Sequence, residues 1–95
     1  MIRFSVFYPS SEGATFDHDY YRNTHVPLCV STWSPDRAEI DRGVDGPYVA
    51  AVHFVFPSSD AMQAALAKDD TAAVLADVAN YTNITPVQQI SEVVG

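Results

Sequence analysis

The sequence predicts an α+β fold in which strands and helices follow one another in the order β, α, β, β, α, β. Apolar and mixed positions alternate over residues 2–8 and 48–56, which indicates two strands with distinct faces. Residues 16–28 read as a short helix, and residues 60–78 are alanine-rich with several N-cap residues. This order is typical of a ferredoxin-like, four-stranded antiparallel sheet with both helices on one face.

The first helix is expected to begin at Asp17, whose side chain can cap the unpaired N–H groups of the first turn. Pro27 disfavours helical geometry at Val26, so we expect the regular helix to break or kink there, with Cys29 to Trp33 as a helical continuation. His25 would then lie in the last turn, where the helix dipole favours a protonated imidazole. As an exposed helix-end group it should be replaceable by alanine without loss of folding.

The same helix contains several groups that can donate, accept or transfer protons. His18, Tyr21 and His25 have the spacing i, i+3 and i+7, which places them along one helical face, while Tyr20 should point elsewhere. His25 has two interpretations on these grounds. It is either a helix-terminus histidine bonded to a loop carbonyl or a proton-transferring group of a functional site.

The remaining elements follow from turn residues and apolar patterns. Pro57 should end the strongest strand, and the alanine-rich region is either two helices or one interrupted helix. The expected elements are a weak strand at Arg37 to Arg42, the strong strand at Tyr48 to Phe56, helices at Asp60 to Lys68 (capped by Ser58 or Ser59) and at Thr71 to Val78 (capped by Asp69 or Asp70), and a last strand at Ile84 to Val94.

Composition limits the class of protein. The 95 residues are expected to form a single domain, residues 1–95, small enough to gain stability from association with a second copy. A formal net charge of −7 with scattered basic residues argues against nucleic-acid binding. The single cysteine, Cys29, reads as a small buried hydrophobe. With neither a signal peptide nor a membrane span in the sequence, the expected location is cytoplasmic.

Three stretches of this chain resemble the EthD family, which is named for ethyl tert-butyl ether degradation and belongs to the dimeric α+β barrel superfamily. They are the opening strand IRFSVFYP, the closing stretch NYTNITPVQQISEVV and, most specifically, the pattern F-D-x-x-Y-Y-x-x-x-H-x-P-L from Phe16 to Leu28. The resemblance implies a homodimer in which two sheets meet face to face and close into a barrel. The family name suggests a degradation pathway, and members are often labelled oxidoreductases.

The sheet face turned away from the helices would then enclose a ligand cavity. It is predicted to hold Arg3, Ser5, Phe7, Val49, Ala51, His53 and Val55, a mixture too apolar for water and too polar for an ordinary core. His53 would project into that cavity, although a histidine in mid-strand is as often a hydrogen-bonded core residue. The resemblance also implies that His25 is directed towards the cavity as an acid, base or hydrogen-bond donor.

Other candidates have weaker support. Tyr21 could hydrogen-bond a substrate oxygen or be an ordinary core aromatic. Tyr81 and Asn83 are candidate substrate-binding residues, with a plain turn as the alternative for the asparagine. Trp33 is a further candidate contact, and Asp41 could orient a histidine or simply face solvent.

The leading hypothesis is a cofactor-independent enzyme in which His25, assisted by His53 and Tyr21, transfers protons on a small aromatic or polyketide-like metabolite. The reaction would be an isomerisation, a cyclisation or a reaction with oxygen. The alternatives are a carrier that binds an apolar metabolite without chemistry and, with less support, a haem-binding protein. The histidines lack the short spacings of metal ligands, and no nucleotide fingerprint is present, so neither a metal nor a cofactor is expected.

Overall fold

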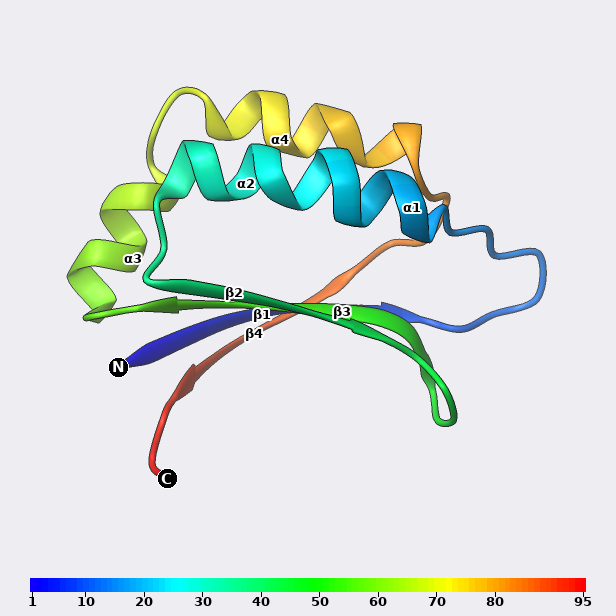
Figure 1. The fold of residues 1–95 in the computed structure, drawn as a ribbon, viewed down its shortest axis with the longest axis horizontal. Helices are drawn as coiled ribbons and strands as arrows, with labels where there is room; N and C mark the ends of the chain where they lie inside the picture. Colours follow the sequence, from blue (N-terminus) through cyan, green and yellow to red (C-terminus); the bar gives the residue numbers. More distant parts are fainter.

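The structure, a computed structural model, describes all 95 residues as one sheet covered on one face by helices (Figure 1). The elements in chain order are β1 (Ile2–Pro9), α1 (His18–Tyr20), the π-helical turn η1 (Tyr21–His25), α2 (Val26–Trp33), β2 (Arg37–Arg42), β3 (Tyr48–Phe56), α3 (Ser59–Leu66), α4 (Thr71–Asp77), the short 3₁₀ helix η2 (Val78–Asn80) and β4 (Val87–Glu92).

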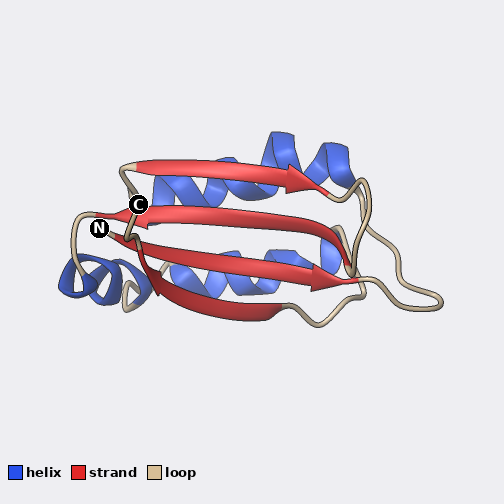
Figure 2. Cartoon of the chain, turned by 90° about the horizontal axis from the view of Figure 1, so that it is seen from below, coloured by secondary structure: helices blue, strands red, loops and turns tan.

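The four strands are ordered β2-β3-β1-β4, and each neighbouring pair is antiparallel. Figure 2 views the sheet from below, and all helices lie behind it. This arrangement confirms the predicted α+β, ferredoxin-like fold class. None of the helices has the length and apolar character needed to cross a membrane.

The main core lies between the sheet and the helices. It contains fourteen buried residues, among them Phe4 of β1, Phe54 of β3 and Trp33 of α2. The Trp33 ring meets both phenylalanines edge to face, at centroid distances of 6.1 Å from Phe4 and 5.3 Å from Phe54. Burial of one such large side chain stabilises a fold by roughly 1.5–3 kcal/mol, so this cluster fixes α2 on the sheet.

The helical segment runs without interruption from His18 to Trp33, so the helix does not break at Pro27, and the helical continuation over Cys29 to Trp33 is confirmed. One π turn precedes the proline, in which the N–H of Val26 donates to the carbonyl of Tyr21, five residues earlier. The wider turn accommodates Pro27, which lies in the first turn of α2. His25 is therefore in the middle of a helical run and is only 4% exposed, so the prediction of an exposed helix-end histidine is also wrong.

Most other predicted elements are confirmed. Strands β2 and β3 have the expected bounds, Asp17 and Ser58 cap their helices through side-chain hydrogen bonds, and the alanine-rich region forms two helices. Asp70 stands at the start of α4 but makes no side-chain capping bond. The last strand is shorter than the predicted span from Ile84, because pairing with β1 extends only from Val87 to Glu92.

The face of the sheet turned away from the helices is mixed in character, as predicted. The strand registers place on it Arg3, Ser5 and Phe7 of β1, Val49, Ala51, His53 and Val55 of β3, Arg37, Glu39 and Asp41 of β2, and Val87, Gln89 and Ser91 of β4. We call this set the open face. Its two arginines balance its two acidic residues, whereas the chain as a whole carries a charge of −7.

Candidate functional site

An apolar cavity of about 210 Å³ lies between the sheet and the helices, on the opposite side of the sheet from the open face. The predicted ligand cavity on the open face needs the sheet of a second copy, so the single chain does not test that prediction. The sheet wall of the helix-side cavity includes Phe4, Val6, Val52 and Phe54. Its helix walls include Tyr21, His25, Cys29, Trp33, Val74 and Val78. No lysine, arginine, aspartate or glutamate lines it.

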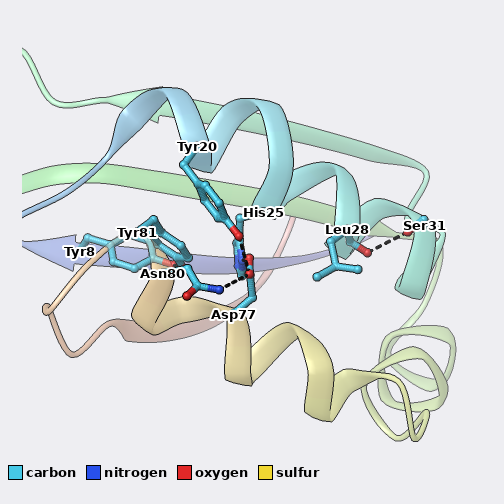
Figure 3. A network of polar contacts seen from close by, with 8 residues as sticks. All are labelled: Tyr8, Tyr20, His25, Leu28, Ser31, Asp77, Asn80 and Tyr81. Carbon is cyan, nitrogen blue, oxygen red and sulfur yellow. Dashed lines mark hydrogen bonds and ion pairs between the residues drawn. The ribbon is translucent and has the colours of Figure 1, made fainter.

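A histidine–aspartate pair joins the first helical segment to α4 beside this cavity. His25 Nδ1 lies 2.8 Å from Asp77 Oδ2. The other carboxylate oxygen accepts from the Tyr20 hydroxyl at 2.6 Å and from the Asn80 side-chain amide at 2.9 Å. Figure 3 shows these three side chains converging on Asp77. The carboxylate is thus fully engaged and holds the imidazole in one orientation.

The protonation state of His25 follows from these contacts. Burial acts to raise the pKa of Asp77, but its hydrogen bonds from Tyr20, Asn80 and His25 outweigh this and lower the pKa below its ordinary value. An ionised carboxylate only accepts, so Nδ1 carries the imidazole proton. Burial lowers the pKa of His25, against the smaller opposing effect of Asp77, and the ring is neutral at pH 7. Nε2 makes no hydrogen bond in the protein, and His25 is among the residues that line the cavity.

The π turn is what brings Tyr20 and His25 to one carboxylate. In a regular α-helix, side chains five residues apart are separated by about 140° around the axis. A turn closed by an i to i+5 hydrogen bond brings such a pair nearly into line. The prediction that Tyr20 points elsewhere is wrong for this reason. His18 does not join the site, since its ring packs on Phe16 with centroids 4.7 Å apart.

Tyr21 is among the residues that line the same cavity, and its hydroxyl is buried next to the Tyr8 hydroxyl. It is 1% exposed, and its hydroxyl is the one buried side-chain polar atom without a hydrogen-bond partner. Burial raises its pKa above the ordinary value, so this hydroxyl remains protonated and can donate. The Tyr21 ring stacks on His25 at an interplanar angle of 17°. An unpartnered buried donor beside a free imidazole nitrogen is an arrangement suited to a ligand oxygen.

The other predicted residues are divided among several places. Trp33 lines the cavity, with its indole N–H donating to Thr71 Oγ1 at 2.9 Å. The Tyr81 ring packs against the His25 ring, with centroids 4.5 Å apart. Its hydroxyl forms a hydrogen bond with the Tyr8 hydroxyl at an oxygen–oxygen distance of 2.7 Å. Asn83 lies away from the cavity, where it accepts from Thr15 N–H and bonds the carbonyl of Gly13, so it joins two loops as the turn interpretation expected.

His53 lies on the open face, and the structure does not bring it to a ligand site with His25. Strand alternation turns it away from its neighbours Val52 and Phe54, which face the cavity. Both ring nitrogens are engaged, Nδ1 with Ser5 Oγ at 2.7 Å and Nε2 with Asp41 Oδ2 at 2.9 Å. Asp41 therefore does orient a histidine, as one of its two interpretations held.

Comparison with solved structures gives a close relative. An EthD-like protein from Ralstonia eutropha JMP134 is 38% identical to this chain, with a TM-score of 0.91 over 99% of this chain and 92% of the other. The chain belongs to the EthD family. Comparisons with family models and with curated proteins give no match.

Two more distant structures share the fold of this EthD-family protein. SnoaB, a cofactor-independent oxygenase from Streptomyces nogalater, has a TM-score of 0.75 at 12% identity, over 99% of this chain and 93% of its own. A dimeric ferredoxin-like protein of unknown function from Thermobifida fusca has a TM-score of 0.64 at 17% identity, over 97% of this chain and 90% of its own.

Sequence reasoning missed Asp77 in this EthD-family protein. The available signal was an acid beside the apolar face of the last helix, at i+3 from Val74 and next to Val78. Cys29 is buried, and burial raises its pKa to about 12, which agrees with the prediction of an unreactive thiol. No group of three or more histidine, cysteine or acidic side chains is placed to hold a metal ion.

Proposed function

We propose that this EthD-family protein is an enzyme in which His25 acts as a general base on a small organic molecule held in the helix-side cavity. One observation supports the proposal: Asp77 holds the proton of His25 on Nδ1, while Nε2 makes no hydrogen bond and His25 lines an apolar cavity. A neutral imidazole in such a place can take a proton at physiological pH.

The reaction step that fits these groups is enolisation. Nε2 takes a proton from the carbon next to a carbonyl; the electron pair of that C–H bond forms a C=C bond, and the π electrons of the carbonyl move to its oxygen to give the enolate. The Tyr21 hydroxyl donates to this oxygen and stabilises its charge. Where the ketone is conjugated to a C=C bond, return of the proton to the far carbon of the extended enolate gives isomerisation, and attack of the enolate carbon on a second carbonyl of the same molecule gives cyclisation. Reaction of the same carbanion with oxygen is a third outcome, and the fold shared with SnoaB agrees with it.

Hydrogen–deuterium exchange tests the step without knowledge of the natural substrate. The protein is incubated with 1-tetralone, a two-ring ketone, in deuterated buffer, and loss of the signal of the proton next to the carbonyl is followed by NMR. We expect exchange above the buffer rate, abolished in His25→Gln and reduced in Tyr21→Phe. Exchange at the buffer rate for several ketones that bind would contradict the enzyme and favour the carrier, which the apolar, uncharged lining also suits.

We also propose that the protein is a homodimer that pairs through the open face. This face is apolar in part and its formal charges cancel, so bringing two copies together causes no net charge repulsion. A structure with the same fold is described as dimeric. Light scattering should give about twice the chain mass of 10.4 kDa.

A single substitution tests which face pairs. Val87 lies on the open face and is 50% exposed, so Val87→Asp should fold and yet yield monomers. Val44→Asp, in the exposed β2–β3 connection, is the matched control and should remain dimeric. A monomeric wild type, or a dimer untouched by Val87→Asp, would contradict the proposal.

A further inference from the structure

We propose that the cavity selects neutral ligands of one or two rings that present one hydrogen-bonding group to His25 and Tyr21, and that it rejects carboxylates and phosphates. This rests on the proposed function, because it takes the same cavity as the ligand site. It adds the charge, the size and the polar end of the molecule that enters.

The charge of the ligand follows from the residues around the cavity. None of the sixteen lining residues is a lysine or an arginine, and twelve are hydrophobic. The nearest ionised group is the Asp77 carboxylate behind His25, and the whole chain carries a charge of −7. An anionic ligand would lose its hydration without gaining a cation, and it would approach a negative protein. A neutral ligand loses less hydration free energy and is not repelled by the negative charge of the protein.

The polar end follows from which lining groups are already satisfied. The Tyr8 hydroxyl is paired with Tyr81, and Thr71 Oγ1 accepts from Trp33. Besides the Gln88 amide and the Thr71 hydroxyl hydrogen, two groups of the lining residues have no partner: the Tyr21 hydroxyl, a donor, and His25 Nε2, an acceptor. A phenol or enol hydroxyl fits both, donating to Nε2 and accepting from Tyr21.

The size of the ligand follows from the volume and from the open side of the cavity. About 210 Å³ is below the roughly 300–1,000 Å³ of sites for drug-sized molecules. Leu75 of α4 and Gln88 of β4 are exposed and also line the cavity, so its mouth lies between these two elements. The buried end therefore accepts one or two rings, and larger substituents must extend through the mouth.

Three ligands with the same rings separate charge from shape. Calorimetry at pH 7.5 compares 2-naphthol, 2-naphthamide and 2-naphthoate, of which only the last is charged. We expect the naphthol and the amide to bind with similar dissociation constants and the carboxylate to bind roughly a hundredfold more weakly or worse. Tyr21→Phe should weaken the naphthol by about three- to tenfold, and Tyr48→Phe, a hydroxyl outside the cavity, should not change it.

The outcomes distinguish this inference from the proposed function. If the carboxylate binds as tightly as the amide, the charge selection is wrong, and enolisation in the cavity is untouched. If the neutral pair binds selectively while ketone exchange stays at the buffer rate, the selection holds and the catalytic proposal fails. If no ligand binds, or Tyr48→Phe matters as much as Tyr21→Phe, the helix-side cavity is not the ligand site and both proposals are overturned.

Discussion

The two sides of the sheet each carry a histidine paired with an aspartate, and the two pairs differ in what the second ring nitrogen does. His25, between the sheet and the helices, bonds Asp77 through Nδ1 and leaves Nε2 free at an apolar cavity. His53, on the open face, bonds Asp41 through Nε2 and Ser5 through Nδ1. The same residue pair therefore leaves one ring nitrogen without a partner on one side and forms a closed hydrogen-bond chain on the other.

Burial adds to the difference between the two pairs. The side chains of His25 and Asp77 are 5% and 13% exposed, against 22% and 62% for His53 and Asp41. Water screens the outer pair, so its contribution to stability is small. The inner pair acts in a less polar medium, where a fixed carboxylate orients the imidazole more strongly. A histidine–aspartate contact alone is thus a poor marker of function, and the free nitrogen decides.

The largest expected effect is on the rate of ketone exchange when each histidine in turn is replaced by glutamine. His25→Gln should lower the rate of ketone exchange by about 10²- to 10⁴-fold, the usual contribution of a general base, while His53→Gln should leave it within about twofold. NMR of the ketone gives both rates. Equal losses in the two variants would contradict the distinction between the two sides.

Replacing Asp77 should likewise lower the exchange rate much more than replacing Asp41. Asp77→Asn replaces an acceptor by an amide that can donate to Nδ1, which moves the imidazole proton to Nε2 and removes the base. We expect a loss on the order of 100-fold in the exchange rate. The far-ultraviolet circular dichroism spectrum, which reports folding, should be unchanged. Asp41→Asn, the matched change on the open face, should have no such effect, and a comparable loss there would count against an oriented base.

Stability should fall with decreasing pH because of the inner pair. The pKa of His25 is lowered by burial in the folded protein, so the unfolded chain binds its proton more readily. The stabilisation is complete above the unfolded pKa near 6.5 and is lost as pH falls through the lower folded pKa. Between pH 7.5 and 5.5 we expect wild type to lose about 1 kcal/mol more unfolding free energy than His25→Gln. Equal losses in urea titrations would argue against a buried neutral imidazole.

The smallest expected effect is an increase in the free energy of unfolding. Tyr21→Phe removes a buried hydroxyl that has no partner, so the free energy of unfolding should rise by about 1 kcal/mol even though ligand affinity falls. Tyr8→Phe, which breaks a buried hydroxyl pair, should instead lower it. A destabilised Tyr21→Phe variant would mean that this hydroxyl has a protein partner in solution.

Much of the fold could be predicted from the sequence, because it depends on local patterns. The alternation over Tyr48 to Phe56 and the caps at Asp17 and Ser58 gave correct elements. The helix break at Pro27 was wrong, because a π turn accommodates a proline where the rule for regular helices forbids it.

The site was less predictable, since it depends on contacts distant in sequence. Asp77 lies 52 residues from His25, and no spacing rule links them. The π turn also altered which side chains share a face, which brought Tyr20 in. The two sides of β3 were assigned correctly, but the cavity between the sheet and the helices was not foreseen. Alternation tells which residues share a face but gives no volume, and volume depends on how α2 and α4 pack.

The most direct test of a base held by Asp77 is the protonation of the individual imidazole nitrogens. Long-range ¹H–¹⁵N correlation spectra at pH 7.5 resolve both nitrogens of each histidine, and His25→Gln assigns the signals. We expect His25 to be protonated on Nδ1 and bare on Nε2, with only the Nε2 signal moving strongly when 2-naphthol is added. A proton on Nε2, or a spectrum that changes at His53 and not at His25, would contradict it.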